Sequence, residues 1–553
     1  MGPHSVDPPQ LGCLALPPDS GAAGEPVILE ADIYYPQGEG PFPVLLMRQP
    51  YGRAIASTVV YAHPRWYASQ GYIVVIQDVR GRGTSTGEFD LFRHEAGDGY
   101  ATVLWAANLP GSNGRVGMYG FSYQGMTQLY AASQRPAPLK TLIPAMVGYD
   151  LYQDWAYENG ALLLQLGLAW ALQLAAETAR RRQDRTAYQR LYQAAHHLPL
   201  DGPNPACPAL LRELAPESFF HDWLRHPQDD AYWQSLRPDL SQVDLPMLHI
   251  GGWADPYLRG DLRLYHQMQE QSSQPQHLWI GPWGHLPWSR RVGLLDFGPA
   301  ADSPVDRLQL QWFDHFLKGQ STDLTTAPSV HLFEMGSHQW QAFNHWPSTT
   351  PECLYLRSTG LAAIHPQDGE LTTTLPERQG QDTWVHDPWR PVPSLGGHSA
   401  IPAGYFERSA LDGRSDVLTY TTSPLVTPLQ VVGSAHLSLY CQADSISFDL
   451  SAILSEVYPD GRVINLTQGH KTQGEGGPGD LLLLALDLHP TSFLIPRGHS
   501  LRLSLAAACF PAYPVNSGTG QPPGTSETID HRIITLVVWH GGAYRSSLEL
   551  PRR

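Results

Sequence analysis

The chain has 553 residues, a length that suggests roughly two to four domains. Hydrophobic residues make up 42% of the chain and charged residues 16%, which allows a large core and excludes a mostly disordered protein. With 36 basic and 52 acidic residues the net charge is −16, so nucleic acid and anionic membrane surfaces are not expected partners.

The sequence carries few signals that indicate a cellular compartment or a membrane span. The five cysteines lie far apart, and their odd number argues against a disulfide framework. The N-terminal segment has no basic stretch followed by an apolar run, so we expect a cytoplasmic protein, with a removed leader left open. The one long apolar stretch, residues 161–176, is interrupted by Gln165 and Gln173 and is short for a bilayer span, which favours a buried or cleft-lining helix.

The first 150 residues alternate between strand-like and helix-like segments. This order predicts a mainly parallel sheet with helices on both faces. Strands are expected over residues 27–35, 44–47, 72–77 and 116–119, and helices over residues 54–70, 95–108 and 126–133.

A helical block interrupts this pattern. Its helices are rich in Ala, Leu, Gln and Arg, and strand-like runs return afterwards at residues 246–250 and 277–280. The block is therefore expected to be a cap inserted into the sheet domain. We predict a core formed by residues 1–148 and 244–325, with a cap over residues 149–243.

The C-terminal part has no long helical pattern. Short β-rich runs separated by turn residues begin at residues 330–334, with long loops expected over residues 358–410. This pattern predicts an all-β sandwich or jelly roll over residues 326–553.

The sharpest motif is YGFSYQG at residues 119–125, between a predicted strand and a predicted helix. Ser122 would lie on a tight strand-to-helix turn, with its hydroxyl at the carboxyl end of the sheet. The usual nucleophile turn has glycine two residues after serine, but here Tyr123 and Gln124 precede Gly125. An ordinary glycine-rich turn stays open as the alternative.

A serine nucleophile requires a histidine base and a carboxylate that orients it, in the chain order Ser, Asp, His for this type of sheet. Asp255 follows the strand-like run at residues 246–250, and His285 follows the run at residues 277–280. Taken singly, Asp255 could be a helix N-cap and His285 a turn residue. Their shared position at strand ends, in the required order, favours a catalytic role.

Five motifs stand out in the sequence: RQPY at residues 48–51, DVRGRGTSTG at 78–87, GFSYQG at 120–125, GWAD at 252–255 and GPWGH at 281–285. Together with residues 416–420, 449, 459–461 and 510–513, they resemble the cocaine-esterase / X-prolyl dipeptidyl peptidase family of serine hydrolases, which also contains the α-amino acid ester hydrolases. The match to Gly-x-Ser-Tyr-x-Gly accounts for the displaced glycine.

The resemblance implies an α/β-hydrolase core with an inserted helical cap and a C-terminal jelly roll. It also implies that Ser122 is the nucleophile, His285 the base and Asp255 its orienter. The oxyanion hole would combine the Tyr51 hydroxyl with the backbone N–H of Tyr123. No cofactor is implied, and the sequence has no metal-binding motif.

The loop at residues 78–87 invites comparison with a phosphate-binding loop. It lacks the Gly-Lys-Ser/Thr ending, and its glycines do not have dinucleotide-binding spacing. We therefore expect it to pack beside the nucleophile turn, with Asp78 and Arg80 in structural hydrogen bonds.

Substrate specificity depends on charge near the pocket. Family members that cleave α-amino acid esters carry acidic residues just after the catalytic aspartate, but here Pro256–Arg259 contain none. Asp150, Asp154 and Glu158 at the cap entry could supply negative charge, although solvent-facing carboxylates are the commoner interpretation. Dipeptidyl peptidase members also usually carry an extra N-terminal domain, and only about 25 residues precede the first predicted strand here.

Aromatic residues at matching positions suggest an apolar acyl pocket. Trp155, Trp170 and Tyr257 would line it, with Tyr405 and Phe406 approaching from the β domain. The alternative is that the two tryptophans are simply core residues of the helical block.

We therefore predict a serine esterase that prefers small-molecule esters with apolar or aromatic acyl groups. An X-Pro dipeptidyl peptidase, an α-amino acid ester or amide hydrolase and an acyltransferase, all using the same three residues, remain alternatives. A carbohydrate-binding protein with a decayed hydrolase core is a further alternative from another class. The oligomeric state is left open, with a homodimer among the options.

Overall fold

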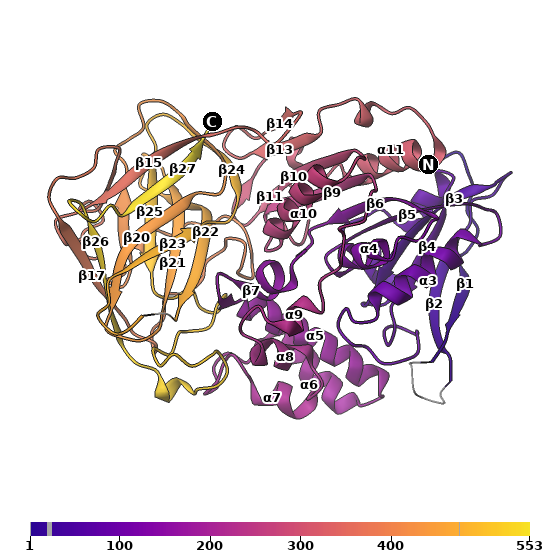
Figure 1. Cartoon of the computed structure of the whole chain (residues 1–553), viewed down its shortest axis with the longest axis horizontal. Helices are drawn as coiled ribbons and strands as arrows, with labels where there is room; N and C mark the ends of the chain where they lie inside the picture. The colour runs from indigo at the N-terminus through magenta and orange to yellow at the C-terminus, as the bar shows by residue number, and fades with distance from the viewer. Residues whose placement is uncertain (1, 19–24, 475) are drawn as a thin grey trace.

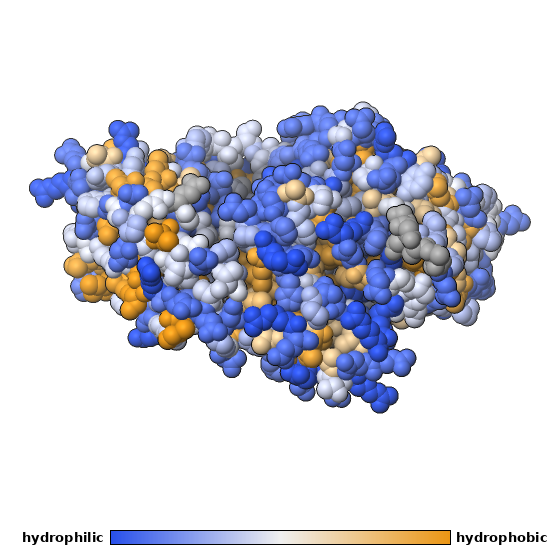
Figure 2. All heavy atoms as spheres, turned by 60° about the horizontal axis from the view of Figure 1, so that its bottom comes forward, coloured by the Kyte–Doolittle hydropathy of each residue, from blue (hydrophilic) through white to orange (hydrophobic). Residues whose placement is uncertain are grey.

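The computed structural model describes residues 2–18, 25–474 and 476–553. Figure 1 shows three parts: an α/β part at the right, a helical part at the lower centre and a β part at the left. The face in Figure 2 is mostly hydrophilic, with a group of exposed hydrophobic residues at the left end, where the β part lies.

A ten-stranded sheet forms the α/β part, and its strands run parallel from β4 to β13 in spatial order. Both edges are antiparallel. The spatial order is β1 (Gln10–Leu16), β2 (Val27–Tyr34), β4 (Ile73–Asp78), β3 (Phe42–Gln49), β5 (Ser112–Phe121), β6 (Leu139–Ala145), β9 (Met247–Ala254), β10 (Gln276–Gly284), β13 (Val330–Glu334) and β14 (Gln339–Phe343).

Helices cover both faces of this sheet because its central strands are apolar on both sides. In β3, Leu46 packs into the cluster that contains Val103 and Leu129, whereas Leu45 packs into the cluster that contains Trp312. These helices are α1 (Arg53–Ala56), α2 (Pro64–Ser69), α3 (Glu95–Ala107), α4 (Tyr123–Ser133), α10 (Leu258–Gln271) and α11 (Val305–Lys318), with the 3₁₀ turns Pro299–Ala301 and Asp323–Thr325. The predicted two-sided parallel sheet is confirmed.

The helical cap lies between β6 and β9 in the sequence, as predicted. The long apolar stretch forms β8 and most of α5, whose buried face carries Leu164, Leu168 and Leu172. In the part of the chain that the structure describes, no helix has the length and apolarity needed to cross a membrane. The cap consists of a π-helix (Leu151–Ala156), β7 (Tyr157–Glu158), β8 (Ala161–Leu162), α5 (Leu164–Arg181), α6 (Arg185–His196), α7 (Ala209–Leu214), α8 (Phe219–Arg225) and α9 (Ala231–Gln234).

The C-terminal part is a thirteen-stranded β domain. Strand β20 shows the alternating burial of a strand with one face on the core. A jelly roll remains our interpretation of this domain. Its elements are β15 (Thr350–Arg357), β16 (Glu370–Thr372), β17 (Gly380–His386), β18 (Leu418–Thr421), β19 (Leu429–Gly433), β20 (His436–Ala443), β21 (Phe448–Val457), β22 (Val463–Gln473), β23 (Leu482–Asp487), β24 (Thr491–Ile495), β25 (Ser500–Ala506), β26 (Ile534–His540) and β27 (Ser547–Arg552), with α12 (Ser409–Asp412) and a 3₁₀ turn at Thr528–Asp530.

The structure differs from the sequence prediction at the junction of the two sheets. The run at residues 330–334 was expected to open the β domain, but as β13 it pairs in parallel with β10. Strand β14 then adds an antiparallel edge, so the second sheet begins at β15. A small hairpin of β11 (Arg291–Val292) and β12 (Leu295–Asp296) follows β10.

Candidate active site

Ser122 lies between β5 and α4 in a strained turn. Its φ of 59° and ψ of −127° are unusual for a residue with a side chain, and its backbone N–H donates to Ala145 O at 2.9 Å. Positive φ at a serine between a strand and a helix is typical of a nucleophile turn, in which the side chain is held away from both elements. Ser122 is 6% exposed, so the hydroxyl is nearly buried.

Two glycines allow this turn to form. A Cβ on Gly120 would lie 2.5 Å from Gln124 Cβ, and a Cβ on Gly125 would lie 2.3 Å from Val147 Cγ1. Gly120 therefore makes room for Gln124, the residue that occupies the usual glycine position. Gly125 lets α4 approach the residues that follow β6.

Asp255 and His285 meet at the ends of neighbouring parallel strands. His285 Nδ1 lies 2.5 Å from Asp255 Oδ2, and the Tyr257 backbone N–H donates to Asp255 Oδ1 at 2.7 Å. Because a carboxylate only accepts, the hydrogen of His285 lies on Nδ1, which leaves Nε2 available as a base. The imidazole packs 5.4 Å from the ring of Phe121, the residue before Ser122.

Tyr51 follows β3 at the same edge of the sheet. Its backbone N–H is held by Gln49 Oε1 at 2.9 Å, and its hydroxyl accepts the indole N–H of Trp170 at 3.1 Å. Burial raises the pKa of Tyr51 to about 12, although hydrogen bonds from Trp170 and Ser122 and the charge of Arg82 oppose the rise. Tyr51 is therefore a neutral hydrogen-bond donor at physiological pH. The backbone N–H of Tyr123 opens α4 and has no partner within the helix.

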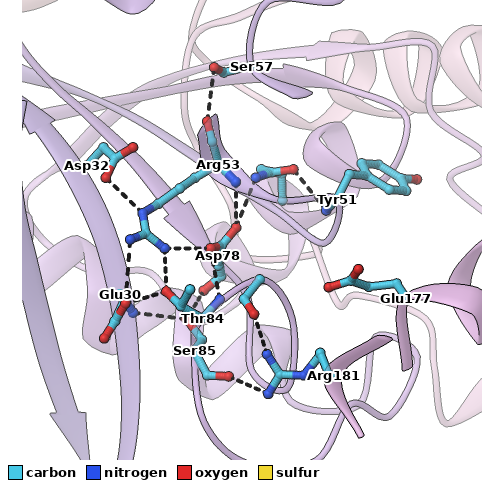
Figure 3. A network of polar contacts seen from close by, with 12 residues as sticks. Glu30, Asp32, Tyr51, Arg53, Ser57, Asp78, Thr84, Ser85, Glu177 and Arg181 are labelled. Atoms are coloured by element: carbon cyan, nitrogen blue, oxygen red, sulfur yellow. Dashed lines mark hydrogen bonds and ion pairs between the residues drawn. The ribbon is translucent and has the colours of Figure 1, made fainter. Parts of the chain in front are cut away.

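Asp78 connects the Tyr51 segment to the glycine-rich loop, as Figure 3 shows. Its carboxylate accepts from Gln49 Nε2 at 3.1 Å, from the Arg53 backbone N–H at 2.7 Å and from the Arg53 guanidinium at 2.7 Å. Gly83 is required here, since a Cβ would lie 2.0 Å from the Asp78 carboxylate. The predicted structural roles of Asp78 and Arg80 are confirmed, with Arg80 paired to Asp98 at 2.6 Å.

Three of the predicted pocket residues lie together beside the imidazole. Trp155 lies 4.4 Å from Tyr257 and 5.4 Å from Trp170, measured between ring centroids. Tyr257 in turn meets His285 edge to face at 5.0 Å. The three rings form one continuous apolar wall that reaches the candidate base.

Tyr405 and Phe406 lie elsewhere. Tyr405 packs its ring 5.4 Å from Phe297, and its backbone pairs with Gly293 beyond β11. Phe406 lies close to Gly293 and Gly396. Among the described residues, neither ring contacts the three-ring wall, so a role in substrate binding stays a prediction for both.

The cap carboxylates are buried rather than solvent-facing, which corrects the commoner interpretation of the sequence. Each is paired with an arginine, and Glu158 also accepts from His398 and Tyr513, both at 2.7 Å. Burial alone would raise the pKa of Glu158, but Arg259 and His398 hold it well below its ordinary value. The pairs are Asp150 with Arg237 at 2.8 Å, Asp154 with Arg263 at 3.0 Å and Glu158 with Arg259 at 2.9 Å.

Asp261 is a buried acid that sequence analysis missed. It lies in the first turn of α10, where Oδ1 accepts the Val147 backbone N–H at 2.8 Å and Oδ2 has no hydrogen-bond partner. Burial, and then the charge of Asp255, raise the pKa of Asp261 well above its ordinary value.

The core, cap and sheet-end residues define an α/β-hydrolase, and comparisons with known proteins place it more closely. Residues 24–287 match the X-Pro dipeptidyl-peptidase (S15 family) model, and residues 322–549 match the X-Pro dipeptidyl-peptidase C-terminal non-catalytic domain. Cocaine esterase of Rhodococcus sp. is 31% identical over 89% of this chain and 91% of its own length. The chain therefore belongs to the S15 family of serine hydrolases that includes cocaine esterase.

Solved structures of lower identity share the fold. An aminopeptidase from a marine sediment archaeon (Thaumarchaeota archaeon) is 23% identical, with a TM-score of 0.81 over 98% of this chain and 96% of its own. An α-amino acid ester hydrolase is 22% identical, with a TM-score of 0.80 over 100% of this chain and 97% of its own.

The close approach of Gly125 to Val147 predicts that Gly125→Ala destabilises the protein. The added methyl group would overlap Val147, and such overpacking costs about 1–3 kcal/mol. Thermal unfolding measures the effect. Gly97→Ala in α3 is the control, since a Cβ there meets nothing within 4 Å and is expected to stabilise by about 0.5–1 kcal/mol. Equal melting temperatures for both variants would contradict the packing argument.

The raised pKa of Asp261 predicts a pH-dependent effect of Asp261→Asn on stability. The folded state binds the proton of Asp261 more tightly than the unfolded state does. Its carboxyl therefore lowers the free energy of unfolding as pH rises from the pKa of Asp261 in the unfolded state towards its pKa in the folded state. The variant should gain stability relative to the parent over that range. Denaturant melts at several pH values test this expectation.

Asp244→Asn is the control for that series. Asp244 is exposed and accepts from Ser273 and Ser272, which lower its pKa. The contribution of Asp244 to the free energy of unfolding is present at pH values above its pKa in the unfolded state and is lost as pH falls. The Asp244→Asn variant should therefore be less stable than the parent at neutral pH. If both variants changed stability in the same direction, the assignment of Asp261 as a buried acid with a raised pKa would be wrong.

Proposed function

We propose that this protein is a carboxylic ester hydrolase that works through an acyl-enzyme on Ser122. The observation that carries the proposal is the 2.5 Å His285–Asp255 contact beside the strained Ser122 turn. Ser122 Oγ attacks the ester carbonyl carbon while His285 Nε2 takes the hydroxyl proton. His285 then returns the proton to the departing alkoxide, and water releases the acid by the same steps in reverse.

The negative charge that develops on the carbonyl oxygen needs fixed donors. The Tyr51 hydroxyl and the Tyr123 N–H are the two we assign to this oxyanion hole. Both belong to segments that buried polar contacts hold, since Gln49 binds the backbone of Tyr51 and Glu95 accepts from the Tyr123 hydroxyl at 2.8 Å. Donors that do not need to reorganise lower the barrier most.

The relatives named above include an esterase, an aminopeptidase and an α-amino acid ester hydrolase, so the acyl group must be argued from this chain's own pocket. The wall of Trp155, Trp170 and Tyr257 suits a flat apolar acyl group. Each cap carboxylate is already paired with an arginine, which makes its charge less available to a substrate ammonium. We therefore favour uncharged, aromatic acyl groups, and a cytoplasmic location remains a prediction.

The nucleophile assignment predicts that Ser122→Ala and His285→Ala each lower kcat by at least about 10³-fold on an aryl ester. The double variant should be little worse than either single one, because the residues act as a unit. Ser133→Ala at the end of α4 is the control and should keep full activity. A fluorophosphonate probe should label the parent and Ser133→Ala but not Ser122→Ala; more than a tenth of the parent rate in Ser122→Ala would refute the assignment.

The neutralised carboxylates predict selectivity against α-amino acid esters. With phenylacetate methyl ester and phenylglycine methyl ester, kcat/KM should favour the first while the amine is protonated, because an ammonium must lose its water without gaining a free carboxylate. The ratio should shrink at a pH where the amine is neutral. A tenfold preference for the protonated amino ester would show that a carboxylate reaches the pocket, and X-Pro amides in the same panel test the peptidase alternative.

A further inference from the structure

Trp170 has a polar contact in addition to its place in the aromatic wall. Its indole N–H donates to the Tyr51 hydroxyl at 3.1 Å. An indole N–H can only donate, so the Tyr51 oxygen is the acceptor and its own hydrogen must point elsewhere. Ser122 is a second hydrogen-bonding neighbour of that hydroxyl and, like Trp170, opposes the rise of its pKa.

We propose that Trp170 is a positioning residue for the oxyanion hole: its indole N–H holds the Tyr51 oxygen, so that the Tyr51 hydroxyl hydrogen is directed at the substrate oxygen beside Ser122. The inference rests on the proposed function, because it needs Tyr51 to act as an oxyanion donor. A donor that itself accepts a hydrogen bond is polarised and becomes stronger.

The position of the Trp170 ring is fixed from both sides. Phe219 packs 4.8 Å from it and Trp155 packs 5.4 Å from it. Helix α5, which carries Trp170, is also tied to the glycine-rich loop, because Arg181 donates to Gly83 O at 2.5 Å and to Ser85 O at 2.8 Å, as Figure 3 shows. The indole N–H is therefore held against Tyr51 by both the cap and the core.

Arg82 adds a buried positive charge behind this pair. It is 2% exposed, donates to Leu174 O at 3.0 Å one turn after Trp170, and stacks 3.7 Å from the Phe89 ring centroid. Within the described ranges no carboxylate lies at ion-pair distance from Arg82, and its Nε has no hydrogen-bond partner. A buried cation is costly, and the charge of Arg82 favours negative charge developing near Tyr51.

The test must distinguish the role of the Trp170 N–H from the role of the Trp170 ring in substrate binding. It therefore uses p-nitrophenyl acetate, whose acyl group is too small to need the aromatic wall. Trp170→Phe keeps an aromatic ring and removes the N–H. We expect kcat and kcat/KM to fall about five- to tenfold with KM within twofold, as for the loss of one neutral hydrogen bond made in the transition state. Trp233→Phe in α9 is the matched control, because it removes an indole N–H that donates to His226 O at 2.8 Å within the cap, and kcat should stay within twofold.

A double-mutant cycle with Tyr51→Phe gives the decisive readout. Tyr51→Phe alone should lower kcat about 10²-fold, as for other oxyanion donors. In that background Trp170→Phe should cost less than a further twofold, because its partner hydroxyl is gone. Arg82→Met should likewise lower kcat only when Tyr51 is present, and Arg82→Lys should restore most of the loss.

Each failure has a distinct signature. If Trp170→Phe lowered kcat equally in both backgrounds, or no more than Trp233→Phe, the positioning role would be wrong while the esterase proposal stood. If Tyr51→Phe kept full kcat while Ser122→Ala was inactive, the oxyanion assignment of Tyr51 would fail, and the role of Trp170 with it. If an Arg82 variant does not fold, the double-mutant cycle of Trp170 and Tyr51 still decides the positioning role.

Discussion

The parallel register of the first sheet is the constraint on which the candidate site depends. Strands β5, β9 and β10 end directly before Ser122, Asp255 and His285, and β3 ends two residues before Tyr51. Parallel strands bring their carboxyl ends to one edge, so residues separated by more than two hundred positions converge there. The pairing of Gly284 with Ala254 sets His285 beside Asp255, and a one-residue slip would turn one side chain to the opposite face.

Paired buried charges hold the segments beyond those strand ends. Arg48 binds Glu95 at 2.5 Å, and Glu95 in turn accepts the Tyr123 hydroxyl, so the first turn of α4 is anchored to β3 and α3. Asp78 and Arg53 do the same for the Tyr51 segment. Such pairs add little net stability, but losing one partner leaves an uncompensated charge that costs about 3–5 kcal/mol. These pairs fix the positions of the loops, since alternative placements of the loops would leave a charge unpaired.

Local patterns in the sequence were enough to predict the two-sided sheet, the cap and the placement of three candidate site residues at strand ends. Tyr51 came only from the family resemblance, because nothing local marks a tyrosine as an oxyanion donor. The sheet to which residues 330–334 belong could not be predicted, since a short apolar strand fits either sheet. The arginine partners of the cap carboxylates also escaped prediction, because Arg237, Arg259 and Arg263 are brought to them only by tertiary folding.

The contacts of α5 bear on how the cap behaves. Arg82 from the core donates to Leu174 O of this helix, while Arg181 from the helix donates to the backbone of the glycine-rich loop. Glu158 links the cap to Arg259 of the core and to His398 and Tyr513 of the β domain. Lifting the cap would expose unpaired groups in all three parts and would also withdraw Trp170 from Tyr51. The cap is therefore better described as a fixed part of the candidate site than as a mobile lid.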